Sequence, residues 1–395
     1  MTTFDFDKII SRRDTNSVKW DECDDPEVIP MWVADMDFAT APAITNALHR
    51  RIDHPIFGYT LVPESYYDAT INWFARRHHW RISREWIQYT SGVVPALSVV
   101  VKALTQPGDQ VIVQTPVYNC FFSSIRNNGC TIVENPLKRK DLGESLFTYE
   151  MDLNDLEEKA ANPKAKLLIL CNPHNPAGRV WTPEELIRLN DICMRHGVRV
   201  VSDEIHCELV MSGNRFTPFA SLSKECLQNS ITCNSPSKSF NTAGLQIANI
   251  ICSDADIRQR IDRAININEV CDVNPFGVIA LEAAYNEGEP WLNALCQYLE
   301  DNYKALKSFF ASNLPQLPIT MLEGTYLVWV DISPLGTDAD TLTERLLKEA
   351  KVMVNAGTMY DTTPAGQNYI RINIACPRTR MMDGLRRIEK TINNH

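Results

Sequence analysis

The sequence lacks both a run of Lys and Arg and a long hydrophobic run. Its 39 basic and 49 acidic residues give a net charge of -10, and without clustered cations no segment suits the phosphate backbone of a nucleic acid. The most apolar stretch, residues 93–104, includes Pro95, Ser98 and Lys102 and is too short to cross a bilayer. Residues 1–13 match neither a signal peptide nor a transit sequence. We therefore expect a cytoplasmic protein that binds neither nucleic acid nor a membrane.

Motifs for metal ions and dinucleotides are also absent. None of the 12 cysteines belongs to a C-x-x-C pair, and the 8 histidines form no H-E-x-x-H or comparable spacing, so we expect no metal site. The cysteines are expected to be mostly buried, reduced thiols, which behave as small hydrophobic side chains. A G-x-G-x-x-G motif is missing too, which argues against a dinucleotide-dependent dehydrogenase.

The length and the pattern of the chain indicate two domains. With 395 residues and 44% hydrophobic content, the chain can bury an extensive core. Between about residues 85 and 255, short β-rich segments alternate with helical patterns, which is typical of a mostly parallel sheet in an α/β fold. A long helix is predicted over residues 280–313, followed by strands and a further helix. We predict a large domain over residues 46–280 and a smaller α+β domain formed by residues 281–395 and 1–45.

One helix has clear start and stop signals. Thr182 is a candidate N-cap, Pro183 suits the first turn, Glu185 completes a capping box and Gly197 ends the helix. The strands predicted around this helix cover residues 110–114, 166–171, 198–202, 230–233 and 246–252.

Two polar segments follow buried strands of this region, at the sheet edge where open α/β folds bind ligands. Residues 172–178 read NPHNPAG, which by itself predicts only a turn. Asp203 follows the next strand and could pair with a protonated ring nitrogen or simply cap the following turn.

Two further segments fit the same edge. Residues 235–238 (SPSK) offer two hydroxyls for phosphate oxygens and an amine, on Lys238, that can form an imine. A single lysine is more often a solvated surface residue, so this segment indicates a site only in combination with the other segments. Residues 90–96 (TSGVVPA) form a strand-to-helix turn whose free N–H groups can bind a phosphate. Together the four segments favour a site for pyridoxal phosphate (PLP) anchored by Lys238.

These motifs resemble the fold-type I PLP enzymes, which have the aspartate aminotransferase-like fold. The matching segments are NPHNPAG, Ser202-Asp203-Glu204 and SPSKSFNTAGL. More narrowly, the chain resembles the MalY/PatB branch of cystathionine β-lyases and related carbon–sulfur (C–S) lyases. The segments that carry this second resemblance are 15–21 (TNSVKWD), 31–38 (MWVADMDF), 57–60 (FGYT), 203–206 (DEIH), 237–245 (SKSFNTAGL) and 324–331 (GTYLVWVD).

The resemblance implies roles around the pyridine ring. Lys238, Asp203 and Tyr118 would be the catalytic residues, with Lys238 as anchor and base. Tyr118 would stack on the ring, and Asp203 would pair with the ring nitrogen. Asn175 would hydrogen-bond the phenolic oxygen, near which His206 stands where many aminotransferases have Tyr.

The resemblance also implies how the phosphate and the substrate are held. Arg371 would bind the substrate α-carboxylate. Tyr59 would reach the phosphate and the substrate from a partner subunit, which implies a homodimer with shared active sites. Gln246 stands where many aminotransferases place a phosphate-binding Arg, so other groups must compensate for the missing positive charge. These other phosphate contacts would come from Gly92, Val93, Val94, Ser235 and Ser237.

The activity implied by the resemblance is β-elimination from L-cystathionine or a related L-cysteine S-conjugate. Lys238 would remove the α-proton, and the products would be a thiol such as homocysteine, pyruvate and ammonia. An aminotransferase acting on a small amino acid is the nearest alternative, because it would use the same groups. A regulatory, protein-binding role leaves no motif and stays open. A serine acyl-enzyme of the S-x-x-K type is disfavoured, because K-T-G is missing.

Overall fold

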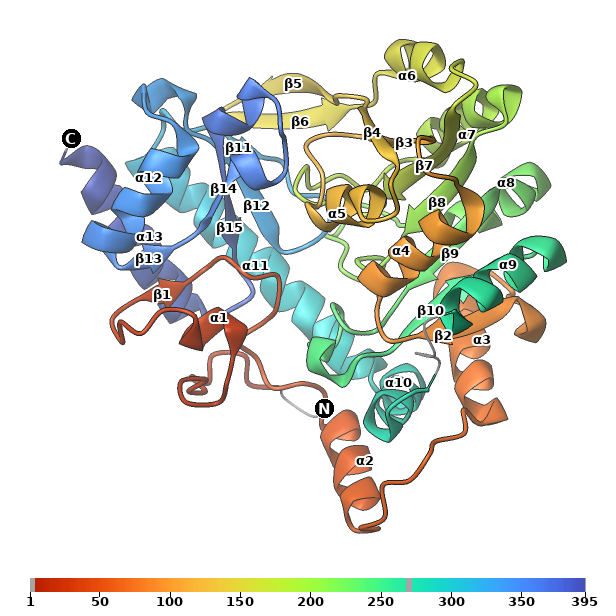
Figure 1. The fold of residues 1–395 in the computed structure, drawn as a ribbon. Coiled ribbons are helices and arrows are strands. Elements are labelled where there is room, and N and C mark those ends of the chain that lie inside the picture. The colour runs from red at the N-terminus through yellow and green to blue at the C-terminus, as the bar shows by residue number, and fades with distance from the viewer. Residues whose placement is uncertain (1–3, 268–271, 395) are drawn as a thin grey trace.

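The computed structural model describes residues 4–267 and 272–394. The strands of its first sheet are β2 (Ile87–Thr90), β3 (Gln110–Val113), β4 (Thr131–Glu134), β7 (Ala165–Cys171), β8 (Arg199–Asp203), β9 (Ser230–Asn234) and β10 (Ala248–Ile251). Their spatial order is β2, β10, β9, β8, β7, β3, β4 (Figure 1). β10 pairs antiparallel with β2 and β9, and all the other pairs of neighbouring strands are parallel. The mostly parallel sheet predicted from the sequence is therefore present, and it contains all five strands predicted there.

Helices cover both faces of this sheet, because its central strands are apolar on both sides. In β7, Leu167 and Ile169 pack on one helical layer, whereas Leu168 and Leu170 pack on the other. The first layer contains α4 (Val93–Leu104), α5 (Cys120–Arg126) and α9 (Ala255–Asn266). The second contains α6 (Leu153–Ala160), α7 (Pro183–His196) and α8 (Lys224–Asn229). The polar residues that follow the strands are thus left at the open edge of the sheet.

The start and stop signals of α7 are confirmed. The Thr182 hydroxyl accepts a hydrogen bond from Glu185 N at 3.2 Å, and the Glu185 carboxylate accepts one from Thr182 N at 2.9 Å. Gly197 ends the helix with φ of 68°, a left-handed conformation that glycine adopts without strain.

The single helix predicted over residues 280–313 is wrong. The chain instead forms α10 (Pro275–Glu287) and α11 (Glu289–Asn313), which are separated at Gly288. Pro290 lies in the first turn of α11, and because proline has no N–H it cannot extend a preceding helix. Gly288 also packs so closely on Phe240 that a Cβ atom would lie 2.5 Å from its ring.

The second sheet lies on the other side of the molecule, with the blue C-terminal elements in Figure 1. Its strands, in spatial order, are β14 (Asn355–Ala356), β15 (Tyr369–Asn373), β12 (Leu327–Asp331), β11 (Ile319–Thr320), β6 (Leu146–Glu150) and β5 (Lys138–Gly143). The β5–β6 hairpin belongs to the predicted large domain by sequence, yet β6 pairs with β11 of this second sheet. The domain boundaries stay a prediction, and any division must take this pairing into account.

The N-terminal region joins the two halves. Strand β1 (Ile29–Pro30) pairs with β13 (Val352–Met353). The helices α2 (Pro42–Ile52) and α3 (Glu64–His78) contact α10.

The remaining helices are α1 (Val18–Asp21), α12 (Ala339–Arg345) and α13 (Arg378–Asn393). No helix in the described part of the chain combines the length and the apolar character needed to cross a membrane. The cytoplasmic location stays a prediction.

A buried carboxylate fixes the loop after β8 to helix α3. Glu208 accepts hydrogen bonds from Trp73 Nε1 at 2.6 Å and Arg77 Nε at 2.7 Å, and His78 Nε2 lies 2.7 Å away. Cys207 completes a cluster whose possible metal ligands lie within 4.8 Å of one another. Both oxygens of the Glu208 carboxylate are already bound by protein groups, Oε1 by Trp73 and His78 and Oε2 by Arg77, so the contacts favour a structural role for the cluster.

Candidate active site

A cavity of about 290 Å³ opens at the carboxyl ends of β7, β8 and β9. Because parallel strands end at the same edge, segments far apart in the sequence meet there. Nine of the residues predicted to form the site line this cavity: Gly92, Val93, Val94, Tyr118, Asn175, Asp203, His206, Ser237 and Lys238. Ala34, Cys171, Ile205 and Gln246 also line it.

Lys238 lies in the loop after β9, and its amine points to the N-terminal region. Nζ donates a hydrogen bond to Ala34 O at 2.6 Å. Burial lowers the pKa of Lys238, and the nearby positive charge of Arg371 acts in the same direction, whereas Asp35 and Asp203 oppose it. A lysine with a lowered pKa more readily supplies a neutral amine, which is the form that attacks carbonyl groups and accepts protons.

Asp203 ends β8 as a buried carboxylate. Its Oδ1 atom accepts a hydrogen bond from Ile205 N at 3.1 Å, and its backbone carbonyl accepts one from Asn172 N at 3.0 Å. Burial raises the pKa of Asp203 to about 7, although the hydrogen bond from Ile205 N and the charge of Lys238 both lower it. A buried carboxylate of this kind suits a cationic ring nitrogen, which would stabilise its charged form.

The two polar side chains expected near the phenolic oxygen also line the cavity. Asn175 Oδ1 accepts a hydrogen bond from Arg371 Nη1 at 3.2 Å. His206 is buried, and its Nδ1 atom has no partner among the described residues. Burial lowers the pKa of His206 to about 3, and the positive charges of Lys238 and Arg371 act in the same direction. The imidazole is therefore neutral near pH 7 and can donate or accept a hydrogen bond.

The phosphate-binding segment predicted from the sequence is the N-terminus of α4. Gly92 is the N-cap of this helix, and Val93 and Val94 begin it, so their free N–H groups and the positive end of the helix dipole face the cavity edge. Ser237 lines the same cavity. Ser235 does not, because its hydroxyl donates to Ile247 O at 2.6 Å and accepts from Ser237 N at 3.1 Å. Ser235 thus holds the loop, and its contact with a phosphate stays a prediction.

Arg371 and Tyr59 lie outside the lining of the cavity. Arg371 is 2% exposed on β15 and is held by Asn175, by Trp32 O at 2.6 Å and by the ring of Tyr360, 4.6 Å from its Cζ atom. Its Nε atom has no partner among the described residues, and the binding of the substrate carboxylate by Arg371 stays a prediction. Tyr59 is 97% exposed, so it cannot contribute to the cavity of its own chain.

Sequence reasoning missed the strap, residues 32–37, as part of the site. Trp32 O accepts from Arg371, and Ala34 O accepts from both Lys238 and Tyr326. The segment was noted within the motif MWVADMDF, but its contacts use backbone carbonyls. Because any residue type offers a carbonyl, the sequence carries no direct signal for them.

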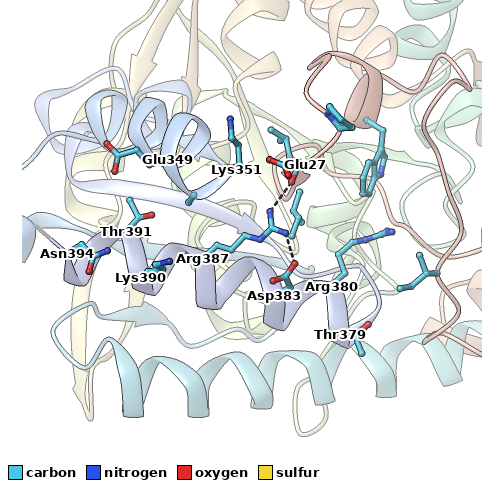
Figure 2. Close-up of a pocket in the computed structure, with 16 residues that line it drawn as sticks. Glu27, Glu349, Lys351, Thr379, Arg380, Asp383, Arg387, Lys390, Thr391 and Asn394 are labelled. Atoms are coloured by element: carbon cyan, nitrogen blue, oxygen red, sulfur yellow. Dashed lines mark hydrogen bonds and ion pairs between the residues drawn. The ribbon is translucent and has the colours of Figure 1, made fainter.

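A larger cavity, of about 730 Å³, lies elsewhere, between the N-terminal segment and α13. In Figure 2 the charged side chain of Arg387 pairs with protein groups, because it donates to Glu27 O at 2.9 Å and forms an ion pair with Asp383 at 2.9 Å. Lys351 pairs with Asp25 at 2.8 Å. This cavity contains none of the residues predicted to be catalytic.

Comparisons with known proteins identify the family and the fold of the chain. The family model "Aminotransferase class I and II" matches residues 26–388. Cystathionine beta-lyase PatB of Bacillus subtilis (strain 168) is 44% identical over 391 residues, which is 98% of this chain and 99% of PatB. Cystalysin of Treponema denticola, which contains pyridoxal 5'-phosphate, matches with a TM-score of 0.95 and 34% identity over 100% of both chains. The PLP-bound C–S lyase of Staphylococcus hominis matches with a TM-score of 0.90 and 35% identity over 98% of this chain and 99% of its own. The fold and the family resemblance predicted from the sequence are confirmed.

In protein prepared without a bound cofactor, we expect Asp203→Asn to raise the free energy of unfolding at neutral pH. The pKa of Asp203 in the folded chain, about 7, lies above that of an unfolded aspartate, about 4. The folded state therefore binds more protons between these values, and the stability of the wild type falls as the pH rises through this window. Asparagine keeps the shape of the side chain without the charge.

Urea unfolding at about pH 4.5 and about pH 7.5 measures this effect, and the gain from Asp203→Asn should be larger at the higher pH. Asp262→Asn, on the exposed side of α9, is the control and should change little. Equal stability of wild type and Asp203→Asn at both pH values would contradict the interpretation.

Proposed function

Because the chain belongs to the aminotransferase class I and II family, we propose that it is a PLP-dependent C–S β-lyase. It cleaves L-cystathionine or a related L-cysteine S-conjugate to a thiol such as homocysteine, pyruvate and ammonia. The observation that carries the proposal is the meeting of Lys238 and Asp203 in one cavity, with Arg371 bound to the Asn175 side chain that lines it. The 44% identity to a cystathionine beta-lyase over 98% of the chain supports this substrate class.

The residues present fit the cofactor. The buried Asp203 carboxylate matches a cationic pyridine nitrogen. Further polar contacts are offered by the N-terminus of α4 and by His206 Nδ1, which has no partner in the part of the chain that the structure describes. Lys238 would hold the cofactor covalently, and Tyr118 would pack against its ring. When bound, PLP supplies an electron sink beside the α-carbon of an amino acid.

Arg371 orients the substrate. Its guanidinium is fixed by Asn175, by Trp32 O and by the ring of Tyr360, while Nε remains without a partner among the described residues. A planar guanidinium held in this way binds a carboxylate in a defined direction. The α-carbon of the substrate is thereby placed for reaction with Lys238.

Lys238 moves the protons. Its amine, whose pKa is lowered by burial, accepts the α-proton of the bound amino acid. The electron pair left at the α-carbon then forms a double bond to the β-carbon as the β-carbon–sulfur bond breaks. The same ammonium can return its proton to the departing thiolate. The remaining fragment is hydrolysed to pyruvate and ammonia.

With PLP and L-cystathionine as the only substrate, we expect pyruvate and free thiol to accumulate. β-Elimination needs no second substrate, whereas transamination needs a keto acid as acceptor. A coupled lactate dehydrogenase assay for pyruvate and a thiol reagent measure the two products. Lys238→Ala is the inactive control. A strict requirement for a keto acid would assign the protein to the aminotransferases.

Replacing Arg371 tests the binding of the carboxylate. We expect Arg371→Lys to lower kcat/KM for L-cystathionine about 10- to 100-fold, mainly by raising KM, because lysine lacks the planar pair of donors. Steady-state kinetics separate the two constants. Arg386→Lys, at an exposed position of α13, is the matched control. An unchanged KM for Arg371→Lys would argue against this role.

We also propose that the protein is a homodimer with shared active sites. At the end of α2 and in the segment that leads to α3, a group of hydrophobic side chains is more than half exposed: Ile52, Ile56, Phe57, Tyr59 and Leu61. Exposing these side chains to water is unfavourable, and a second copy of the chain would bury them. Tyr59 would then reach the cavity of the partner subunit.

Mixing two inactive variants tests the shared sites. Lys238→Ala lacks the lysine, and Tyr59→Ala lacks the tyrosine donated to the partner. In a mixed dimer, one of the two sites contains both native residues. After unfolding and refolding an equal mixture, we expect about a quarter of the wild-type activity. No gain over the separate variants would contradict a shared site.

A further inference from the structure

The segment Gly324-Thr325-Tyr326 has an unusual backbone conformation. Thr325 is fully buried with φ of 70°, a left-handed conformation that a β-branched residue rarely adopts. Its N–H donates to Leu209 O at 2.7 Å. At Gly324, a Cβ atom would lie 2.8 Å from Val180 Cγ2. Backbone strain of this kind persists where the surrounding structure requires it, often at functional sites.

This conformation directs Tyr326 towards the active site. The side chain is completely buried, and its ring lies edge-on to His206 with the centroids 6.0 Å apart. Burial raises the pKa of Tyr326 far above its usual value, so the hydroxyl keeps its proton and is available as a donor. It donates to Ala34 O at 2.9 Å.

Ala34 O is also the acceptor for Lys238 Nζ, at 2.6 Å. A carbonyl oxygen has two lone pairs, and here one is used by the tyrosine and the other by the lysine. The peptides on either side are fixed as well, because Asn373 Nδ2 donates to Val33 O at 2.5 Å and to Asp35 O at 2.8 Å. The carbonyl that receives the lysine amine therefore has a defined direction.

We propose that Tyr326 is a positioning residue, which fixes the Ala34 carbonyl and through it the direction of the Lys238 amine. The catalytic consequence rests on the proposed function, in which this amine accepts the α-proton. The positioning of the amine does not depend on the proposed function, because all the contacts that produce it are made between residues of this chain. Tyr326 lies in the motif GTYLVWVD, to which the sequence analysis gave no chemical role.

The shared acceptor also affects the protonation of the amine. Two donors on one oxygen weaken each other, so the Tyr326 hydroxyl makes Ala34 O a poorer acceptor for the lysine ammonium. Removing the hydroxyl should strengthen the contact with the ammonium and raise the pKa of Lys238. The charged and titratable groups that act on the amine, Asp35, Arg371, Asp203 and Cys120, are unchanged by this substitution.

The test compares Tyr326→Phe with Tyr303→Phe. Tyr303, on α11, is a matched control, because its buried hydroxyl also donates to a backbone carbonyl, Thr320 O, at 2.7 Å. Thr320, unlike Ala34, does not line the active-site cavity. Thermal unfolding of both variants reports any loss of stability common to the removal of such a hydroxyl.

The first measurement uses the full chain without cofactor and does not depend on activity. Acetylation of Lys238 by acetic anhydride is followed by mass spectrometry over a series of pH values. We expect the midpoint of the labelling curve to move up by about 0.5 to 1 pH unit in Tyr326→Phe and to stay unchanged in Tyr303→Phe. A curve for Tyr326→Phe that superimposes on the wild type would overturn the proposal.

The second measurement uses the PLP-loaded enzyme. For Tyr326→Phe we expect kcat to fall roughly 10- to 100-fold with KM nearly unchanged, because a base displaced by a fraction of an ångström reacts more slowly. A fall in kcat of the same size in Tyr303→Phe would reduce the effect to a general loss of packing and overturn the proposal. If the wild type has no lyase activity, the proposed function fails, and the labelling experiment still decides the role of Tyr326.

Discussion

The strap, residues 32–37, forms neither a helix nor a strand, so its backbone carbonyls need donors outside a regular ladder of hydrogen bonds. Side chains from both halves of the molecule supply them. Asn241, in the loop after β9, and Asn373, on β15, donate to strap carbonyls at 2.9 and 2.8 Å. Lys238 and Arg371 donate to two others. The groups that would act on the substrate's α-proton and α-carboxylate are therefore oriented relative to each other by one segment of backbone.

Burial gives the groups around this segment unusual protonation states. It lowers the pKa of Lys238, raises that of Asp203 to about 7 and lowers that of His206 to about 3. All three shifts favour the neutral form of the side chain. A cationic ring beside Asp203 would reverse one of these shifts, so the site is suited to a ligand that brings its own positive charge. Perturbed groups gathered in one cavity are typical of active sites.

Much of this site could be predicted from the sequence, because Asp203 and Lys238 each follow a buried strand of a parallel sheet and such strands end at a common edge. Tyr326 could not be assigned a role in the same way. Its direction depends on the positive φ of Thr325 and on the packing of Gly324 against neighbouring loops. These features arise from contacts between distant segments, and no local pattern encodes them.

The sequence by itself determined the family, the mostly parallel sheet and the chemical groups available at its edge, because strand patterns, turns and helix caps are local signals. Only the tertiary structure decided that the β5–β6 hairpin joins the second sheet, and that the Ser235 hydroxyl is used by Ile247 O. It alone showed that Lys238 and Tyr326 share Ala34 O. Each of these features depends on which distant segments meet. Because every residue has a backbone carbonyl, the sequence does not indicate which carbonyl accepts a hydrogen bond from which side chain.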